Sequence, residues 1–486
     1  MNDIATGQAD LARFLDDPAG YFGHSLTRLM TVPRSELDAL QRDGVRARFA
    51  QLRVAIPMLE RLARQRQVAA VDALEDVVPV LFDHAVYKSY PPSLLDQHRY
   101  ADLTAWLNRL TAFDLSGVDV SACRSIDDWL LTLARETPLA VCHTSGTSGS
   151  LSFLPWAKSE WLRMFGTYPV LFFQDFGDFG RPPARLQVPL NLPCVYPFFR
   201  SGGMSHTVAN DAIVHIIAGG EERFHAAYPA RLSADLLLLG ARLKAAAARG
   251  RTAVAAGPEL AARRGEFEML QRDMPAHLAR FFAEMRKRFA GQRVFVLATS
   301  NLLFTMAQNG LAQGISGVFA ADSVVVTGGG KGLELPADWR DTVRRFLGAG
   351  SIHDCYGMSE MAGQFIACEF GHYHAVPWIV PFVLDPADDR LLPRRGRASG
   401  RFAFYDLLVH SRWGGLVTGD AVTLDWDGGC PCGRTAPYLL RDIRRLGGPA
   451  RDGDDDKVSC ADTGETYGEA LEFIGQGGDA AEHQGA

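Results

Sequence analysis

The chain has 486 residues, with 50 Lys and Arg against 56 Asp and Glu and a formal net charge of −6. Hydrophobic residues make up 47% and charged residues 22%, which excludes disorder over most of its length. The mild acidity argues against nucleic acid as the main partner, and no apolar run reaches the roughly 18 residues of a membrane span. Eight cysteines in so long a chain predict no disulfide framework, so we expect a cytoplasmic protein.

Residues 1–135 are patterned as helices. In the stretch 45–65, apolar residues recur at three- and four-residue spacing, which is typical of a helix with one buried face. We therefore predict a helical N-terminal region packed on the core.

Residues 136–376 alternate between two patterns. Strands are predicted at 138–146, 293–300, 323–332 and 351–357, and helices at 232–248, 275–289 and 336–350. Ser233 is expected to cap the first helix and Pro275 to lie in the first turn of the second. This alternation predicts parallel βαβ units and an α/β fold.

The last part of the chain changes character again. Pro, Gly and Arg separate short strand-like runs such as 400–409 and 415–426, so we expect a small β subdomain over residues 377–440. Residues 441–486 form a short C-terminal segment with a polar end.

The segment His143–Ser150 holds five hydroxyls and two glycines within eight residues, after a strand-like run. Glycines let backbone amides approach phosphate oxygens, and hydroxyls donate further hydrogen bonds. The segment is not a Walker loop, since the Gly-Lys-Ser/Thr ending is absent. It is interpreted as an anion cradle, with an ordinary Ser/Gly loop as the alternative.

Three more segments carry chemistry. Thr327–Gly332 ends a strand in three glycines followed by Lys331, which allows a flat group to lie on bare backbone. In Asp354–Glu360, a tyrosine suited to stacking precedes a carboxylate suited to Mg²⁺. In Val417–Asp420, an acidic residue suited to ribose hydroxyls follows Thr-Gly. Taken singly, Thr327–Gly332 and Val417–Asp420 are explained better by ordinary turns, and the alternative for Asp354–Glu360 is a strand terminus with a helix cap.

In this order, the four segments resemble the adenylate-forming (ANL) superfamily, which includes acyl-CoA synthetases, peptide-synthetase adenylation domains and luciferases. The similarity covers roughly residues 140–445 and implies a layered α/β domain with parallel-rich sheets. It implies that Thr144, Ser145, Gly146, Thr147, Ser148 and Gly149 bind the ATP phosphates, and that Gly328, Gly329, Gly330, Asp354, Tyr356 and Gly357 contact adenine. It further places Ser359 beside the phosphates and acyl carboxylate, Glu360 on Mg²⁺, and Asp420 and Arg441 at the ribose.

Two features resemble particular branches. Cys430–Arg434 is similar to the phenylacetate-CoA ligase group, whereas Gly-Gly-Gly-Lys and the region around Cys460 are similar to bacterial acyl-protein synthetases, in which a cysteine near the C-terminus accepts the acyl group. Unlike most of the superfamily, this chain has only about 45 residues after the hinge, so the resemblance leads us to expect a truncated C-terminal domain. Lys331 or Lys457 is then the candidate catalytic cation, and the alternative is Mg²⁺ with arginine alone.

Cys460 has two interpretations, a nucleophile of lowered pKa beside Lys457 or a thiol without chemistry. Cys368, His374, Cys430 and Cys432 offer four ligands of the kind that zinc prefers, with His372 as a substitute for His374. They are interpreted as a structural Zn²⁺ site, against the alternative of unrelated residues. The aromatic and glycine-rich stretch 191–204 lines an acyl pocket or belongs to the core, and His206 has no stronger case than a satisfied core histidine.

The sequence therefore predicts ATP- and Mg²⁺-dependent activation of a small carboxylic acid to acyl-AMP, with Thr144, Glu360, Lys331 and Cys460 as catalytic residues. The acyl group then passes to Cys460 or to a thiol of a carrier or acyl-accepting partner protein. Transfer to CoA, amide formation and a non-catalytic nucleotide-binding scaffold remain as alternatives.

Overall fold

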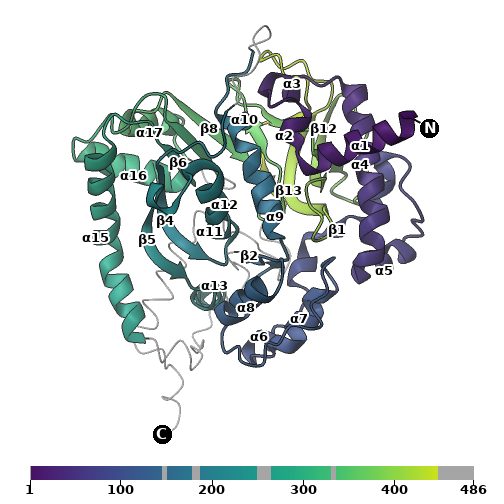
Figure 1. The fold of residues 1–486 in the computed structure, drawn as a ribbon, viewed down its shortest axis with the longest axis horizontal. Coiled ribbons are helices and arrows are strands. Elements are labelled where there is room, and N and C mark those ends of the chain that lie inside the picture. The colour runs from purple at the N-terminus through teal and green to yellow at the C-terminus, as the bar shows by residue number, and fades with distance from the viewer. Residues whose placement is uncertain (1, 145–149, 178–185, 249–263, 330–334, 447–486) are drawn as a thin grey trace.

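The computed structural model describes residues 2–144, 150–177, 186–248, 264–329 and 335–446, and it is mixed α/β as predicted (Figure 1). The helices are α1 (Asn2–Asp16), α2 (Pro18–Tyr21), α3 (Leu26–Met30), α4 (Arg34–Ala55), α5 (Pro57–Gln65), α6 (Ser93–Asp96), α7 (Tyr100–Asn108), α8 (Ile126–Glu136), α9 (Lys158–Gly166), α10 (Tyr168–Phe172), α11 (Ser205–Val208), α12 (Asn210–Ile213), α13 (Ala234–Ala248), α15 (Arg264–Phe289), α16 (Ser300–Ala312) and α17 (Trp339–Leu347). The strands are β1 (Phe82–Asp83), β2 (Cys142–His143), β3 (Phe153–Leu154), β4 (Cys194–Gly202), β5 (Phe224–Leu232), β6 (Phe295–Thr299), β7 (Val324–Gly328), β8 (Ser351–Tyr356), β9 (Phe365–Ala367), β10 (Tyr373–Ala375), β11 (Ile379–Leu384), β12 (Arg397–Asp406), β13 (Gly415–Asp425), β14 (Tyr438–Leu439) and β15 (Arg444–Arg445).

One large sheet organises these elements. Its strands follow the order β11-β12-β13-β14-β10-β9-β8-β7-β6-β4-β5, with β1 and β15 also paired to β13. The stretch from β5 to β8 is parallel and the remainder of the path is antiparallel. The predicted parallel βαβ units are confirmed in β6-α16-β7-α17-β8, where each strand continues directly beside the previous one.

The parallel strands are buried on both faces. Successive residues of β7 alternate between two hydrophobic clusters, with Val324 and Val326 in one and Val325 in the other. The second cluster also contains residues of α13, α15, α16 and α17, which cover one face of the sheet (Figure 1). A strand covered on both faces reads as a continuous apolar run, which explains the pattern Val-Val-Val.

Two of the predicted helices show how well local sequence signals predict where a helix begins. Ser233 caps α13 as expected, since its Oγ accepts a hydrogen bond from the Leu236 amide at 3.4 Å. The helix predicted at 275–289 is confirmed as part of α15, but its predicted start was wrong, because α15 begins at Arg264 and Pro275 lies in its interior. Proline removes one backbone donor, but packing of Phe281, Met285 and Phe289 into the second cluster stabilises the helix.

The predicted helical N-terminal region is confirmed, since α1–α8 precede β2 with only the two-residue β1 among them. Strands β11–β13, from the region predicted as a small β subdomain, are hydrogen-bonded into the same sheet as the parallel strands. The domain boundaries stay predictions. Within the described residues, no helix has the length and apolarity needed to cross a lipid bilayer.

Candidate active site

A cavity opens where two parallel strands part. Strands β4 and β6 pair only at Cys194–Phe295 and Val195–Val296. Beyond these pairs, residues 196–198 of β4 and 297–299 of β6 line a cavity of about 420 Å³. The chain runs from β4 to β5 on one side and returns to β6 on the other. This reversal of strand order is the position at which open α/β sheets bind ligands.

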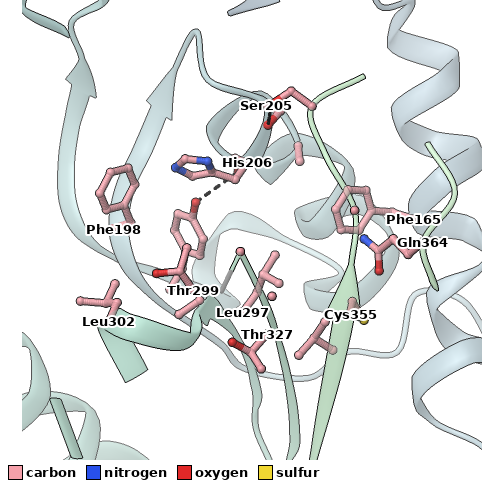
Figure 2. Close-up of a pocket in the computed structure, with 18 of the residues that line it drawn as sticks. Phe165, Phe198, Ser205, His206, Leu297, Thr299, Leu302, Thr327, Cys355 and Gln364 are labelled. Atoms are coloured by element: carbon pink, nitrogen blue, oxygen red, sulfur yellow. Dashed lines mark hydrogen bonds between the residues drawn. The ribbon is translucent and has the colours of Figure 1, made fainter. Parts of the chain in front are cut away.

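The first cavity is largely apolar, as Figure 2 shows. Phe165 and Gln364 lie on one side of it, with Phe198 and Leu302 across from them. His206 also lines it, and burial lowers the pKa of this side chain to about 4, so the imidazole is neutral near pH 7. The stretch 191–204 therefore serves both predicted roles, since Phe198 lines the cavity whereas Cys194 and Phe199 are buried in the core.

A second cavity of about 320 Å³ adjoins the first. Its lining is mixed, with aromatic, charged, glycine and a few small polar or aliphatic residues, namely Ser300, Gly329, Leu335, Trp339, Arg340, Asp354, Cys355, Tyr356, Gly357, Tyr373, Arg441 and Ile443. Gly329, Cys355 and Gly357 line both cavities, so these two spaces meet at the carboxyl ends of β7 and β8. One space is apolar and the other is polar, and a single bent ligand or two reacting molecules would fill them.

Two sequence-predicted segments converge on this junction. Gly328 lines the first cavity, Asp354 and Tyr356 line the second, and Ser359 lines the first. At Gly328 an added Cβ would meet the Cys355 carbonyl oxygen at 2.6 Å, so only glycine fits between β7 and β8. Arg441 lines the second cavity and donates from Nε to the Gly371 carbonyl at 3.2 Å.

Asp420, the third segment, lies beneath Tyr356. The Tyr356 hydroxyl donates to Asp420 Oδ2 at 2.6 Å, and Arg445 Nη1 lies 3.1 Å from Oδ1. Burial, with the Asp420 charge adding to it, raises the pKa of Tyr356 well above its usual value, so the phenol stays protonated. Asp420 is 0% exposed and does not line either cavity. For its carboxylate to reach a ligand, Arg445 would have to move.

Asp354 is held by two partners that the sequence did not indicate. It forms an ion pair with Arg340 of α17, and it accepts a hydrogen bond from the Tyr373 hydroxyl at 3.0 Å. Cys355, the next residue, has a pKa raised well above its usual value by burial. Its thiol therefore stays protonated and is a poor nucleophile, although it lies at the junction.

Ser205 lies between Ser359 and Thr144, the residue at the start of the hydroxyl-rich segment. His143 forms a parallel β-bridge with Met204, which places the next residues, Thr144 and Ser205, beside each other. The Ser205 and Ser359 hydroxyls are 3.1 Å apart. Ser205 was missed in the sequence, because a serine after Gly-Gly-Met has no distinctive local signal.

The Ser359–Glu360 turn is supported from behind by two buried side chains. Trp156 donates its indole N–H to the Ser359 carbonyl at 3.0 Å, and Arg412 Nη2 donates to the Glu360 carbonyl at 2.8 Å. The guanidinium lies over the Trp156 ring at 4.3 Å from the centroid, and Arg412 is 1% exposed. The carboxylate of Glu360 forms no ion pair with any residue that the structure describes, so it is available to a cation.

The four predicted metal-ligand residues lie together. The ligand atoms of Cys368, His374, Cys430 and Cys432 are all within 4.8 Å of one another. The Cys368 and Cys430 sulfurs are 3.7 Å apart and Cys432 Sγ lies 3.3 Å from His374 Nε2. His372, the predicted substitute, also approaches the cluster, with Nδ1 at 3.1 Å from Cys430 Sγ.

Several predicted site residues lie outside the described part of the chain. They are Ser145, Gly146, Thr147, Ser148, Gly149, Gly330, Lys331 and Cys460, together with Lys457. Their assignments stay predictions.

Comparison with known proteins identifies distant likenesses. No family model matches the chain, and none of the curated proteins does. An open conformation of 2-hydroxyisobutyryl-CoA ligase, solved with 2-HIB-AMP and CoA, is 14% identical over 86% of this chain and 77% of that one, with a TM-score of 0.46. MatB from Rhodopseudomonas palustris with ATP is 14% identical over 62% of this chain and 48% of that one, at 0.34. The luciferase-like enzyme of the Zophobas morio mealworm is 12% identical over 63% and 57%, at 0.33. At these values the neighbours carry no inference about activity.

Proposed function

We propose that this protein is an ATP-dependent ligase that activates a carboxylic acid as acyl-AMP, releases pyrophosphate and passes the acyl group to a thiol. The observation that carries the proposal is the pair of cavities meeting at Gly329, Cys355 and Gly357. An apolar space suits the body of an acid, and a polar space with aromatic walls suits a nucleotide. Their junction is where the carboxylate and the α-phosphate would meet.

Each predicted residue has a role in this proposal. Adenine would lie in the second cavity against Tyr356, with Arg441 near the ribose. Asp420 would bind the ribose hydroxyls after Arg445 moves away. Thr144 and the residues that follow it would donate to the phosphates, and Lys331 would supply a positive charge. Ser359 would lie beside the acyl carboxylate.

Two metal ions fit the residues present. Mg²⁺ is usually held by one or two carboxylates together with substrate phosphates, and Glu360 supplies one half-buried carboxylate without an ion-pair partner among the described residues. Mg²⁺ would neutralise charge on the phosphates. Two sulfurs bound tetrahedrally at about 2.3 Å from zinc lie about 3.8 Å apart, close to the 3.7 Å between Cys368 and Cys430. With four protein ligands, this zinc would be structural.

The adenylation step is tested by acid-dependent exchange of labelled pyrophosphate into ATP. We expect exchange with at least one acid of a broad panel, and a loss of about 100-fold or more in Glu360→Gln. Glu60→Gln, at a half-buried glutamate of α5 that lines neither cavity, is the matched control and should keep full exchange. No exchange with any acid would favour the non-catalytic scaffold.

The acyl acceptor needs a separate experiment. Cys460 or a thiol of a partner protein is the proposed acceptor, with CoA as the second candidate and an amine as the third. If Cys460→Ser still forms acyl-AMP but loses covalent acylation seen by mass spectrometry, the acyl-cysteine route is supported. Undiminished transfer to CoA in the same variant, without acylation of the wild-type protein, would contradict it.

A further inference from the structure

The wall of the first cavity is uncharged. None of its described lining residues is Asp, Glu, Lys or Arg. The one ionisable imidazole, His206, is neutral near pH 7 because burial lowers its pKa to about 4. A second ionic group on a bound acid would be desolvated here without a counter-charge, which is unfavourable. An acid bound in this cavity would therefore have a neutral body.

Several hydroxyl groups along this wall already have partners within the protein. Ser205 and Ser359 bond to each other at 3.1 Å, and the Tyr196 hydroxyl donates to the His206 carbonyl at 3.2 Å. Thr327 Oγ1 lies 3.0 Å from the Ser300 hydroxyl. These groups need no ligand to satisfy their hydrogen bonding.

Gln364 differs from them. Its side chain lies at the wall beside Phe165, across the cavity from Phe198 (Figure 2). Its Nε2 donates to the Tyr168 hydroxyl at 2.8 Å. Its Oε1 is shielded from solvent and has no hydrogen-bond partner among the residues that the structure describes. An unpaired buried amide destabilises the folded state. Since Oε1 is shielded from the cavity as well as from bulk solvent, it reaches a ligand only after the side chain rotates, and a ligand that holds the rotated amide would complete its hydrogen bonding.

We infer that Gln364 determines specificity, and that the acid activated here carries a hydroxyl group on an otherwise apolar body, placed to hydrogen-bond with the Gln364 amide. This inference rests on the proposed function. The oxygen and nitrogen of an amide exchange places when the group is turned over, which leaves either an acceptor or a donor unpaired. A hydroxyl group both accepts and donates, so it pairs with Gln364 in either orientation.

The test uses pyrophosphate exchange by the full chain with pairs of acids that differ by one hydroxyl. Suitable pairs are phenylacetate with its meta- and para-hydroxy derivatives, cinnamate with para-coumarate, and octanoate with its terminal hydroxy derivative. We expect the hydroxylated member of at least one pair to be preferred by about 10-fold or more in kcat/KM, the order that one buried hydrogen bond supplies.

Gln364→Leu should abolish this preference while exchange with the unsubstituted acid continues. Its melting temperature without ligand should equal or exceed that of the wild type, because an unpaired polar group is removed. Met361→Leu, at an apolar position of the same wall, should keep the preference. Gln364→Met replaces the leucine variant if the latter does not fold.

The possible outcomes distinguish a failure of the inference about Gln364 from a failure of the proposed function. Exchange that ignores the hydroxyl in every pair, or a preference that survives in Gln364→Leu, would overturn the inference and leave the proposed function standing. Absence of exchange with every acid, at normal melting behaviour, would overturn the proposed function and the inference together.

Discussion

Arg412 shows how a residue outside both cavities acts on the site. Its guanidinium is buried, stacks on Trp156 and donates to the carbonyl of Glu360, the residue proposed to bind Mg²⁺. A desolvated cation–π contact of this kind contributes about 2 kcal/mol. The pair therefore holds the Ser359–Glu360 turn from behind and orients the carboxylate without touching a ligand.

We expect Arg412→Met to lower kcat for pyrophosphate exchange by about 10- to 100-fold, as losses of residues that orient a metal ligand do. Methionine keeps the contact with Trp156 but removes the donor to Glu360. The Mg²⁺ concentration for half-maximal exchange should rise, while KM for the acid should change little. Arg46→Met, which removes a donor to the distant Val71 carbonyl, is the control. An unchanged Mg²⁺ requirement in a folded Arg412→Met protein would assign Arg412 a structural role only.

The Tyr356–Asp420 hydrogen bond makes a prediction about stability. Tyr356→Phe leaves the buried Asp420 carboxylate without this donor, although Arg445 remains beside it. We expect the free energy of unfolding to fall by about 1–3 kcal/mol, measured by urea denaturation. Tyr87→Phe removes a longer hydroxyl-to-carbonyl bond, 3.3 Å to Trp413, and should cost less. Equal losses of unfolding free energy in the two variants would mean that the charge on Asp420 does not strengthen its hydrogen bond with Tyr356.

At the scale of elements, the start of α9 is joined to the turn after β12 by one carboxylate. Glu160 Oε1 accepts from the His410 and Ser411 amides at 2.5 and 2.7 Å, and Oε2 accepts from the Ser411 hydroxyl at 2.6 Å. Burial alone would raise the pKa of Glu160. Bonds to His410 and Ser411 and the Arg412 charge outweigh burial and bring the pKa to about 2.

This lowered pKa gives a pH dependence with a definite sign. The Glu160 carboxylate stabilises the folded state fully above its ordinary pKa of 4.5, and this stabilisation is lost as pH falls from there through about 2. The difference is worth about 3 kcal/mol. We therefore expect Glu160→Gln to be less stable than wild type at pH 7, with the gap closing toward pH 2.5, measured by chemical denaturation across this range. A difference in stability between the two proteins that stays constant with pH would contradict the lowered pKa of Glu160.

Sequence patterns predicted elements far better than they predicted contacts. Strands β6–β8 and helix α17 have apolar patterns from which these elements are predicted directly. Glycine is required at position 328, because a Cβ there would clash with the Cys355 carbonyl oxygen. The Cys/His set was found because its members stand in two short motifs, Cys-x5-His at 368–374 and Cys-x-Cys at 430–432. The supports of the Ser359–Glu360 turn could not be found this way, because Trp156 and Arg412 lie 203 and 52 residues from the groups they contact.

For the whole molecule, the sheet joins parallel strands that shape the cavities to antiparallel strands of the later chain. The passage between them runs through the short strands β9, β10 and β14, which pair over only two or three residues each. The Cys/His cluster lies at this passage, since Cys368 follows β9, His374 is in β10, and Cys430 and Cys432 precede β14. A bound ion would reinforce this sparsely paired part of the sheet.

We therefore expect the purified protein to contain about one zinc ion per chain, measured by elemental mass spectrometry. Cys432→Ser should lose the zinc, and its melting temperature should fall by roughly 5–10 °C, because a ligand that binds only the folded state stabilises it. A strong chelator should lower the wild-type melting temperature by a similar amount and leave the variant unchanged. Cys123→Ser, at a buried thiol remote in sequence from the cluster, should keep its zinc. If the wild type holds no zinc and chelator has no effect, the four residues form a thiol–imidazole cluster without a metal, and the passage between the two halves of the sheet is stabilised by strand pairing and by packing against Tyr438.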